Sequence, residues 1–194
     1  MGFLDRFRGK PEDRGMPKDR GMLEDGGLDP LRDLVLEKLR VGYLVDYDLK
    51  TWRVTDHNRY HYNDGRSSEE WELTEGRTKR YLEHAEGEEG GWSLSRLVPI
   101  GALGDVRQRI LEHDDPPEEV THDGTTYYLE GSVGGYMVPG KGGGRQELIL
   151  WELVDESEDH FLAIMQWSET ELTAACGAFV ADYEFTNILP GEVA

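Results

Sequence analysis

A twelve-residue stretch occurs twice in this sequence, and it limits the possible folds more than any other feature. Residues 71–82 read WELTEGRTKRYL and residues 151–162 read WELVDESEDHFL, and the two align without a gap. Residues 45–54 and 120–129 also align, at a slightly smaller shift. The matched positions are mostly aromatic or aliphatic residues and turn aspartates, which core packing and turn geometry require. The chain therefore repeats a unit of fold rather than a set of reactive groups.

The repeat predicts two units, each a helix followed by antiparallel strands. A third match, of residues 92–99 with 183–190, keeps the same order along the chain. We expect an α+β protein, mainly antiparallel β, with two duplicated helix-plus-meander units that are SH3-like or small and barrel-like. The expected boundaries are 1–28 for a flexible tail with a short amphipathic start, 29–101 for the first unit and 102–194 for the second.

Local patterns predict the elements of the first unit. Asp29 and Pro30 can begin an amphipathic helix that ends at Gly42. The next segment is rich in aromatic and β-branched residues on both sides of an Asp48-Leu49 turn, which predicts a β-hairpin. Three further strand-like runs follow before the second unit begins.

Large aromatic residues at matched positions indicate where the packing lies. Trp71 corresponds to Trp151, and Trp52 corresponds to Tyr127. Since large aromatics dominate core energetics, we expect both pairs to be substantially buried.

One matched pair is polar. Glu72 and Glu152 each lie between a tryptophan and a leucine in an expected strand, so alternation points them away from their neighbours' face. Such a glutamate would contact solvent or pair with an arginine across the sheet. The two carboxylates could instead serve acid–base chemistry if the two units faced each other.

Charge and cysteine content exclude several classes of protein. The chain has 40 acidic and 21 basic residues and a formal net charge of −19. Such a surface repels nucleic acid at long range, so we expect no nucleic-acid partner. The single cysteine, Cys176, excludes an internal disulfide and a multi-thiolate metal site. No apolar window suits a membrane span and the start lacks a signal peptide, so we expect a cytoplasmic protein.

Two segments partly match binding motifs. His57, Arg59 and His61 share one face of an expected strand, where they could bind an anion or a metal, or belong to a half-exposed aromatic strand. Residues 135–141, GYMVPGK, match the first seven positions of a phosphate-binding P-loop, but Gly142 replaces the serine or threonine that binds magnesium. The segment also leads into a strand rather than a helix, so we expect a hairpin loop and no metal or nucleotide cofactor.

The first ten residues, MGFLDRFRGK, combine apolar and basic side chains in a chain that is otherwise acidic. A short basic amphipathic start can dock on a partner or enter a membrane interface weakly, and a frayed terminus is the alternative. The candidate contact residues are Phe3, Leu4, Arg6, Phe7 and Arg8.

Aromatic and glycine positions between residues 40 and 99 resemble a bacterial family named domain of unknown function 4178. The positions that carry the resemblance are Gly42, Val45, Tyr47, Trp52, Trp71 and Trp92. The resemblance implies a small β-rich cytoplasmic unit. It also implies gene neighbourhoods with phage-shock-type membrane-stress proteins, small integral membrane proteins and polyamine synthases. It supplies no catalytic residues.

These observations favour a non-enzymatic adaptor or accessory protein of a bacterial envelope-stress or membrane-associated system. Its expected partner is a phage-shock-type or small integral membrane protein, at the inner face of the membrane. The alternative is a ligand-binding or hydrolytic protein that uses a cleft between the two units. The candidate residues for that cleft are His57, Arg59, His61, Glu72 and Glu152.

Overall fold

The computed structural model describes residues 34–87 and 90–191, and most of these residues are in β-strands. The first half contains η2 (Leu36–Lys38), β1 (Leu44–Tyr47), β2 (Lys50–Tyr62), β3 (Ser67–Glu75), β4 (Thr78–Ala85) and β5 (Trp92–Val98). The second half begins with η3 (Ile100–Leu103), α1 (Val106–His113), β6 (Glu119–His122) and β7 (Thr125–Val138). It continues with β8 (Gln146–Asp155), β9 (His160–Gln166), β10 (Leu172–Val180), η4 (Asp182–Glu184) and β11 (Thr186–Leu189).

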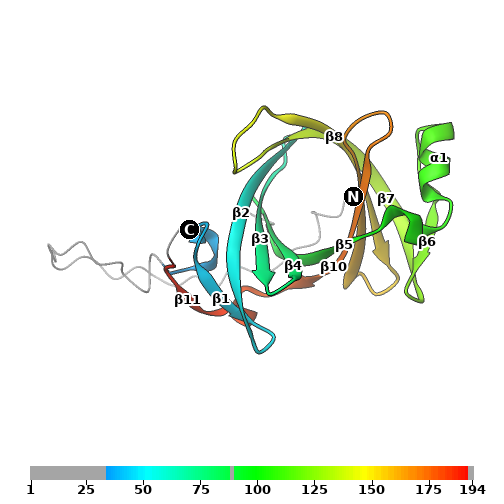
Figure 1. Ribbon diagram of the computed structural model, residues 1–194. Coiled ribbons are helices and arrows are strands. Elements are labelled where there is room, and N and C mark those ends of the chain that lie inside the picture. Colours follow the sequence, from blue (N-terminus) through cyan, green and yellow to red (C-terminus); the bar gives the residue numbers. More distant parts are fainter. Residues whose placement is uncertain (1–33, 88–89, 192–194) are drawn as a thin grey trace, which may run out of the picture.

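Eight of these strands close into one antiparallel barrel (Figure 1). Their order around the wall is β2-β3-β4-β5-β10-β9-β8-β7, and β7 pairs again with β2. One seam places Tyr60 opposite Met137, and the other places Leu97 opposite Ala175. The prediction of two duplicated helix-plus-meander units is therefore wrong. Each sequence half alone would leave two unpaired strand edges, and pairing the halves at both seams satisfies the hydrogen-bonding groups of those edges.

Two further expectations fail for related reasons. The match of residues 92–99 with 183–190 joins unlike positions, because β5 lies in the barrel wall and β11 pairs only with β1. The helix expected before Gly42 is reduced, within the described residues, to the single 3-10 turn η2. Leu36 and Leu39 are buried there, so tertiary packing overrides the helical pattern.

Two apolar cores lie on the outer face of the barrel wall, and a third, around Tyr60, Leu148 and Leu150, lies inside the barrel. The first core packs β2–β5 residues such as Trp52 and Trp71 against Leu36 and Phe185. The second core packs Trp151 and its neighbours in β8–β10 against α1 and η3. Figure 1 shows the covering elements, β1 with β11 and α1 with β6, on opposite sides of the barrel.

Burial of the matched aromatics is confirmed. Trp52, Trp71, Tyr127 and Trp151 are 4%, 0%, 6% and 1% exposed. The Trp71 Nε1 donates to the Leu39 carbonyl, and the Trp151 Nε1 donates to Asp115 Oδ1. Trp71 therefore links the segment before β1 to the barrel wall, and Trp151 links the segment before β6 to it.

The predicted turn at Asp48-Leu49 is present, and both residues have positive φ, at 49° and 59°. The corresponding turn between β6 and β7 uses Asp123 and Gly124, at 50° and 84°. An Asp-Gly pair suits such a turn, whereas leucine is strained by its Cβ in the left-handed region.

We therefore expect Leu49→Gly to raise the free energy of unfolding by about 1 kcal/mol, because Leu49 is fully exposed and loses no packing. Urea denaturation measures the change. The reverse substitution in the other hairpin, Gly124→Leu, should lower stability by a similar amount. Equal stability of Leu49→Gly and the natural protein would contradict the argument.

Candidate functional site

The barrel interior contains a partly open cavity. Its lining residues come from seven of the eight wall strands, β2, β3, β4, β5, β8, β9 and β10. They are Tyr60, Tyr62, Glu70, Glu83, Ser95, Leu150, Glu152, Phe161, Leu162, Ala163, Met165 and Ala175.

The cavity has one polar wall and one apolar wall. Strands β2–β5 contribute tyrosine, glutamate and serine side chains, since alternate residues of each strand face the interior. Strands β8–β10 contribute mainly apolar side chains, among them Leu150, Phe161, Ala163 and Met165, together with the carboxyl of Glu152. A molecule that fills this space would contact both walls.

Glu70 is the centre of the polar wall. Its Oε1 accepts hydrogen bonds from Asn58 Nδ2 at 3.0 Å and from the Tyr60 hydroxyl at 3.3 Å. Burial raises the pKa of Glu70 to about 7, and the like charge of Glu83 adds to the shift. This carboxyl can accept or release a proton near neutral pH.

Glu83 lies directly opposite Glu70 in the β3–β4 pairing. Residues opposite each other in an antiparallel pair are neighbours on one face, and like charges there repel. Burial raises the pKa of Glu83, while the nearby Ser68 and Arg66 side chains lower it. The two glutamates therefore form a close pair inside the cavity.

Glu152 reaches the same cavity from β8. Its Oε2 is 3.4 Å from both terminal nitrogens of Arg66, whose Nε is 2.6 Å from Asp64 Oδ2. The pKa of Glu152 is raised to about 7 because burial outweighs the opposing charge of Arg66, with a further contribution from Glu83. Arg66 is thus shared between two carboxyls, one inside the cavity and one outside.

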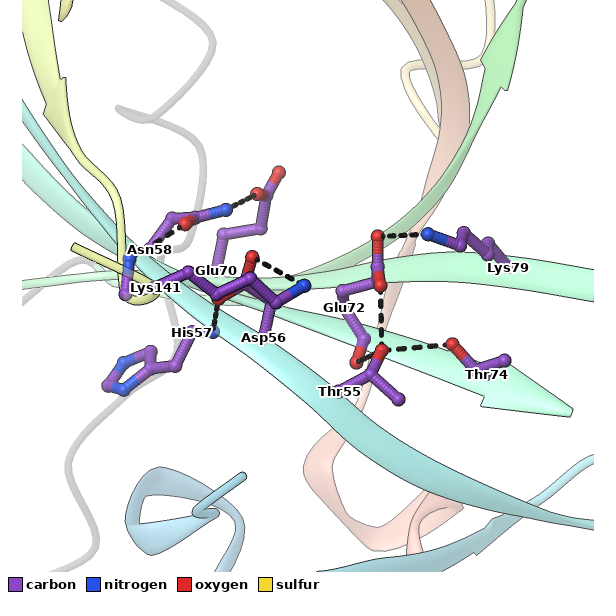
Figure 2. A network of polar contacts seen from close by, with 10 residues as sticks. Thr55, Asp56, His57, Asn58, Glu70, Glu72, Thr74, Lys79 and Lys141 are labelled. Carbon is purple, nitrogen blue, oxygen red and sulfur yellow. Dashed lines mark hydrogen bonds and ion pairs between the residues drawn. The ribbon is translucent and has the colours of Figure 1, made fainter. Parts of the chain in front are cut away.

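A second group of polar side chains lies beside Glu70 on β2 and β3, where Asp56 is opposite Glu72 (Figure 2). Glu72 accepts hydrogen bonds from Thr55 at 2.7 Å and from Lys79 Nζ at 2.8 Å. Burial alone would raise the pKa of Glu72, but these two hydrogen bonds outweigh it and the pKa is lowered. Asp56 is paired with Lys141, 3.2 Å away. Carboxylates of this group therefore have lysine partners.

The strand containing His57, Arg59 and His61 presents these residues on the outer face. Figure 2 shows the His57 ring projecting to the opposite side of the strand from Asn58 and Glu70. His57 stacks on Trp71, with 4.8 Å between ring centroids, and both His57 and Arg59 contact Glu69. Burial is the main reason that the pKa of His57 is lowered.

His61 packs instead against Tyr136, across the β2–β7 seam. The three residues form no common pocket with the cavity, because the barrel wall separates them from it. Glu72 and Glu152 both face the interior but do not meet: Glu72 belongs to the lysine-paired group and Glu152 to the cavity.

The segment that matches a P-loop lies at the β2–β7 seam. Gly135 lies in β7, where a Cβ would approach the His61 carbonyl oxygen to 2.5 Å. A Cβ on Gly140 would approach the His57 carbonyl oxygen to 2.0 Å. These glycines therefore permit the close passage of β7 and its loop along β2, and the segment connects β7 to β8 as predicted.

Other predicted features have simple placements. Cys176 lies in β10, half-buried beside the second core, and burial raises the pKa of its thiol. Phe3, Leu4, Arg6, Phe7 and Arg8 lie outside the described residues, so the membrane or partner contact and the adaptor role stay predictions.

The described residues contain neither a helix that could span a membrane nor a cluster of side chains suited to a metal ion. No helix in that part of the chain has the length and apolarity that crossing a membrane requires. Residues 34–87 and 90–191 also contain no group of three or more histidine, cysteine, aspartate or glutamate side chains positioned to hold a metal ion.

The sequence-based analysis singled out Glu152 but missed the other residues that line the cavity. Glu70 is two positions before Glu72, and Tyr60 and Tyr62 alternate with His57, Arg59 and His61 along β2. The period of two placed these residues on the correct face. It could not indicate that this face is enclosed, because closure depends on the β2–β7 and β5–β10 pairings between the halves.

Comparison with known proteins gives a family and a distant relative. An uncharacterised protein of Aquifex aeolicus (strain VF5) is 26% identical over 193 residues, which cover 98% of this chain and 99% of the relative. No solved structure matches the chain. The family model described as domain of unknown function (DUF4178) matches residues 40–181, a range that contains every residue lining the cavity. The chain belongs to the DUF4178 family.

Proposed function

We propose that this protein binds a small organic molecule inside its barrel. The observation that supports the proposal is the cavity inside the barrel, which has a polar side on β2–β5 and a mainly apolar side on β8–β10. Sites for small molecules are commonly concave and largely apolar, with a few polar groups that fix orientation. The barrel interior has this composition.

The two walls would divide the ligand between them. Leu150, Phe161, Ala163 and Met165 would contact its apolar part, since burial of apolar surface supplies most of the affinity. The Glu70 region would contact its polar part and fix its orientation. This proposal replaces the predicted cleft between two units with the interior of one barrel.

Filling the cavity tests the proposal. Ala163→Phe adds an aromatic ring inside the cavity, and Ile149→Phe adds the same ring on the exposed outer face of β8. Fragments that bind the natural protein in ligand-observed NMR should lose binding to Ala163→Phe and keep binding to Ile149→Phe. Circular dichroism checks that both variants keep the fold, since overpacking costs about 1–3 kcal/mol. Fragment binding that is equal in all three proteins would place the site elsewhere and contradict the proposal.

A further inference from the structure

We propose that the ligand of the barrel is an organic cation, an alkyl amine in its chemical class, whose ammonium group binds between Glu70 and Glu83. This inference rests on the proposed function and specifies the ligand class. Three features of the barrel interior support it: the charge balance of the cavity, the hydrogen-bonding groups beside Glu70, and the apolar side chains opposite.

The first feature is the balance of acidic and basic side chains in the cavity. Three carboxyl groups line the cavity, those of Glu70, Glu83 and Glu152. The basic side chain nearest to them, Arg66, already contacts Glu152 and Asp64. Among the described residues, no lysine, arginine or histidine forms an ion pair with Glu70 or Glu83. Buried carboxylates are ordinarily paired, because an uncompensated buried charge is costly.

The lysine-paired group provides a comparison within the same strands. Glu72, two residues from Glu70 on the same face, has Lys79 at 2.8 Å, and Asp56 has Lys141 at 3.2 Å. The chain therefore supplies lysine partners to these two carboxylates. It leaves the half-buried Glu70–Glu83 pair inside the cavity for a cation from outside.

Hydrogen-bonding groups beside this pair are available as well. Ser68 is 1% exposed and lies on the interior face, two residues from Glu70 and opposite Tyr60. Burial raises the pKa of both Tyr62 and Glu83, and the nearby Ser68 hydroxyl opposes that rise. It nevertheless has no well-formed hydrogen bond within the part of the chain that the structure describes. An ammonium group has three N–H donors, which two carboxylates and one hydroxyl oxygen can accept.

Aromatic rings add to the attraction for a cation. Tyr60 and Tyr62 stack in parallel with 6.3 Å between their centroids, and both line the cavity. The face of a tyrosine ring attracts a positive charge within about 6 Å. A tyrosine in this chain already does so, since the Arg66 guanidinium lies 5.5 Å from the Tyr62 centroid.

The apolar wall then specifies an organic cation. A metal ion would use only the carboxylate side of the cavity, and the described residues contain no cluster positioned to hold one. An alkyl amine uses both sides, with its ammonium group at Glu70 and Glu83 and its chain against Leu150 and Met165.

Three six-carbon probes test the inference: n-hexylamine, hexan-1-ol and hexanoate. Binding is measured by ligand-observed NMR or calorimetry at about pH 8, where an alkyl amine is still protonated. We expect n-hexylamine to bind about ten-fold or more tightly than hexan-1-ol, because hydrogen bonds to charged groups are the stronger ones. Hexanoate should bind least.

Variants identify the site of binding. The double substitution Glu70→Gln with Glu83→Gln should remove the preference for the amine and leave hexan-1-ol binding unchanged. Glu69→Gln is the matched control, because Glu69 is the neighbour of Glu70 in β3 but contacts His57 and Arg59 on the outer face. It should leave both affinities unchanged.

The outcomes separate the two proposals. If hexan-1-ol binds as tightly as the amine and Ala163→Phe abolishes both, the cation inference is overturned and the proposed function stands. If the amine binds equally to the double variant, or loses affinity only with Glu69→Gln, it occupies the acidic surface and the inference is overturned. If no probe or fragment binds inside the barrel, both proposals are overturned.

Discussion

Replacement of Trp71 by alanine is expected to lower the free energy of unfolding by about 3–5 kcal/mol, the cost typical of removing a buried aromatic side chain. Trp71 is 0% exposed, stacks on His57 and lies 5.6 Å from Trp92 between ring centroids. Its Nε1 also donates to the Leu39 carbonyl at 3.1 Å. The substitution leaves a cavity in the first core and a buried carbonyl without its donor.

Two control variants separate these contributions, and urea denaturation with circular dichroism measures all three. Trp71→Phe keeps most of the packing but loses the hydrogen bond, so it should cost less than Trp71→Ala. Trp167→Ala removes a tryptophan that also donates a hydrogen bond, to Thr173, but is only half-buried. It should cost about 1–2 kcal/mol less than Trp71→Ala. Equal losses at both tryptophans would show that the first core does not depend on Trp71.

The importance of Trp71 could be predicted from the sequence, and so could the strand pattern around it. The repeat marked Trp71 and Trp151 as packing residues, and alternation placed Glu72 and Glu152 on the opposite face. Both inferences use short-range information, since a strand's two faces follow from neighbouring residues. The Asp48-Leu49 hairpin was predictable for the same reason.

The closure of the barrel was not predictable in this way. The sequence predicted that the matched tryptophans pack in a core, but not on which side of a closed wall that core lies. In the structure Trp71 and Trp151 lie in cores outside the barrel wall, while Glu70 and Glu152 line its interior. This arrangement depends on pairings such as Tyr60 with Met137, between residues far apart in the chain. Local periodicity carries no information about such pairings.

The candidate site shows the same limit of local sequence patterns. His57, Arg59 and His61 were correctly placed on one face of a strand, yet that face contacts the first core and the β2–β7 seam instead of the cavity. Glu70 and Glu83 were not singled out, because an isolated glutamate in a strand commonly faces solvent. Their importance follows from enclosure and from their direct pairing between β3 and β4.

The carboxyls of Glu70, Glu83 and Glu152 make stability depend on pH. We expect the free energy of unfolding to fall as the pH rises from about 5 to about 7.5. Burial, together with the Glu83 charge, raises the pKa values of Glu70 and Glu152 to about 7, and burial raises that of Glu83. In the unfolded chain these carboxyls titrate near their ordinary value of 4.5.

Between these pKa values the folded protein binds more protons than the unfolded chain, so the stability contribution decreases with pH. It is fully present below about pH 4.5, where both states are protonated, and it is lost once the pH exceeds about 7. The expected loss is on the order of 2–4 kcal/mol for the coupled group. The lowered pKa of His57 acts in the opposite direction, since its folded state binds fewer protons than the unfolded chain as the pH approaches 6.5.

Comparison with Glu70→Gln isolates the contribution of the cavity, because every group outside it titrates alike in both proteins. The neutral glutamine has no charge to bury, and it also relieves the repulsion that Glu83 experiences at high pH. The variant should therefore match the natural protein near pH 5 and be more stable at pH 8. Urea denaturation at several pH values measures this difference, and Glu69→Gln on the outer face should not reproduce it. A Glu70→Gln variant that loses equal stability at pH 5 and pH 8 would show instead that Glu70 remains ionised in the folded protein, held by a partner. In that case its hydrogen bonds from Asn58 and Tyr60 would outweigh the cost of burying its charge.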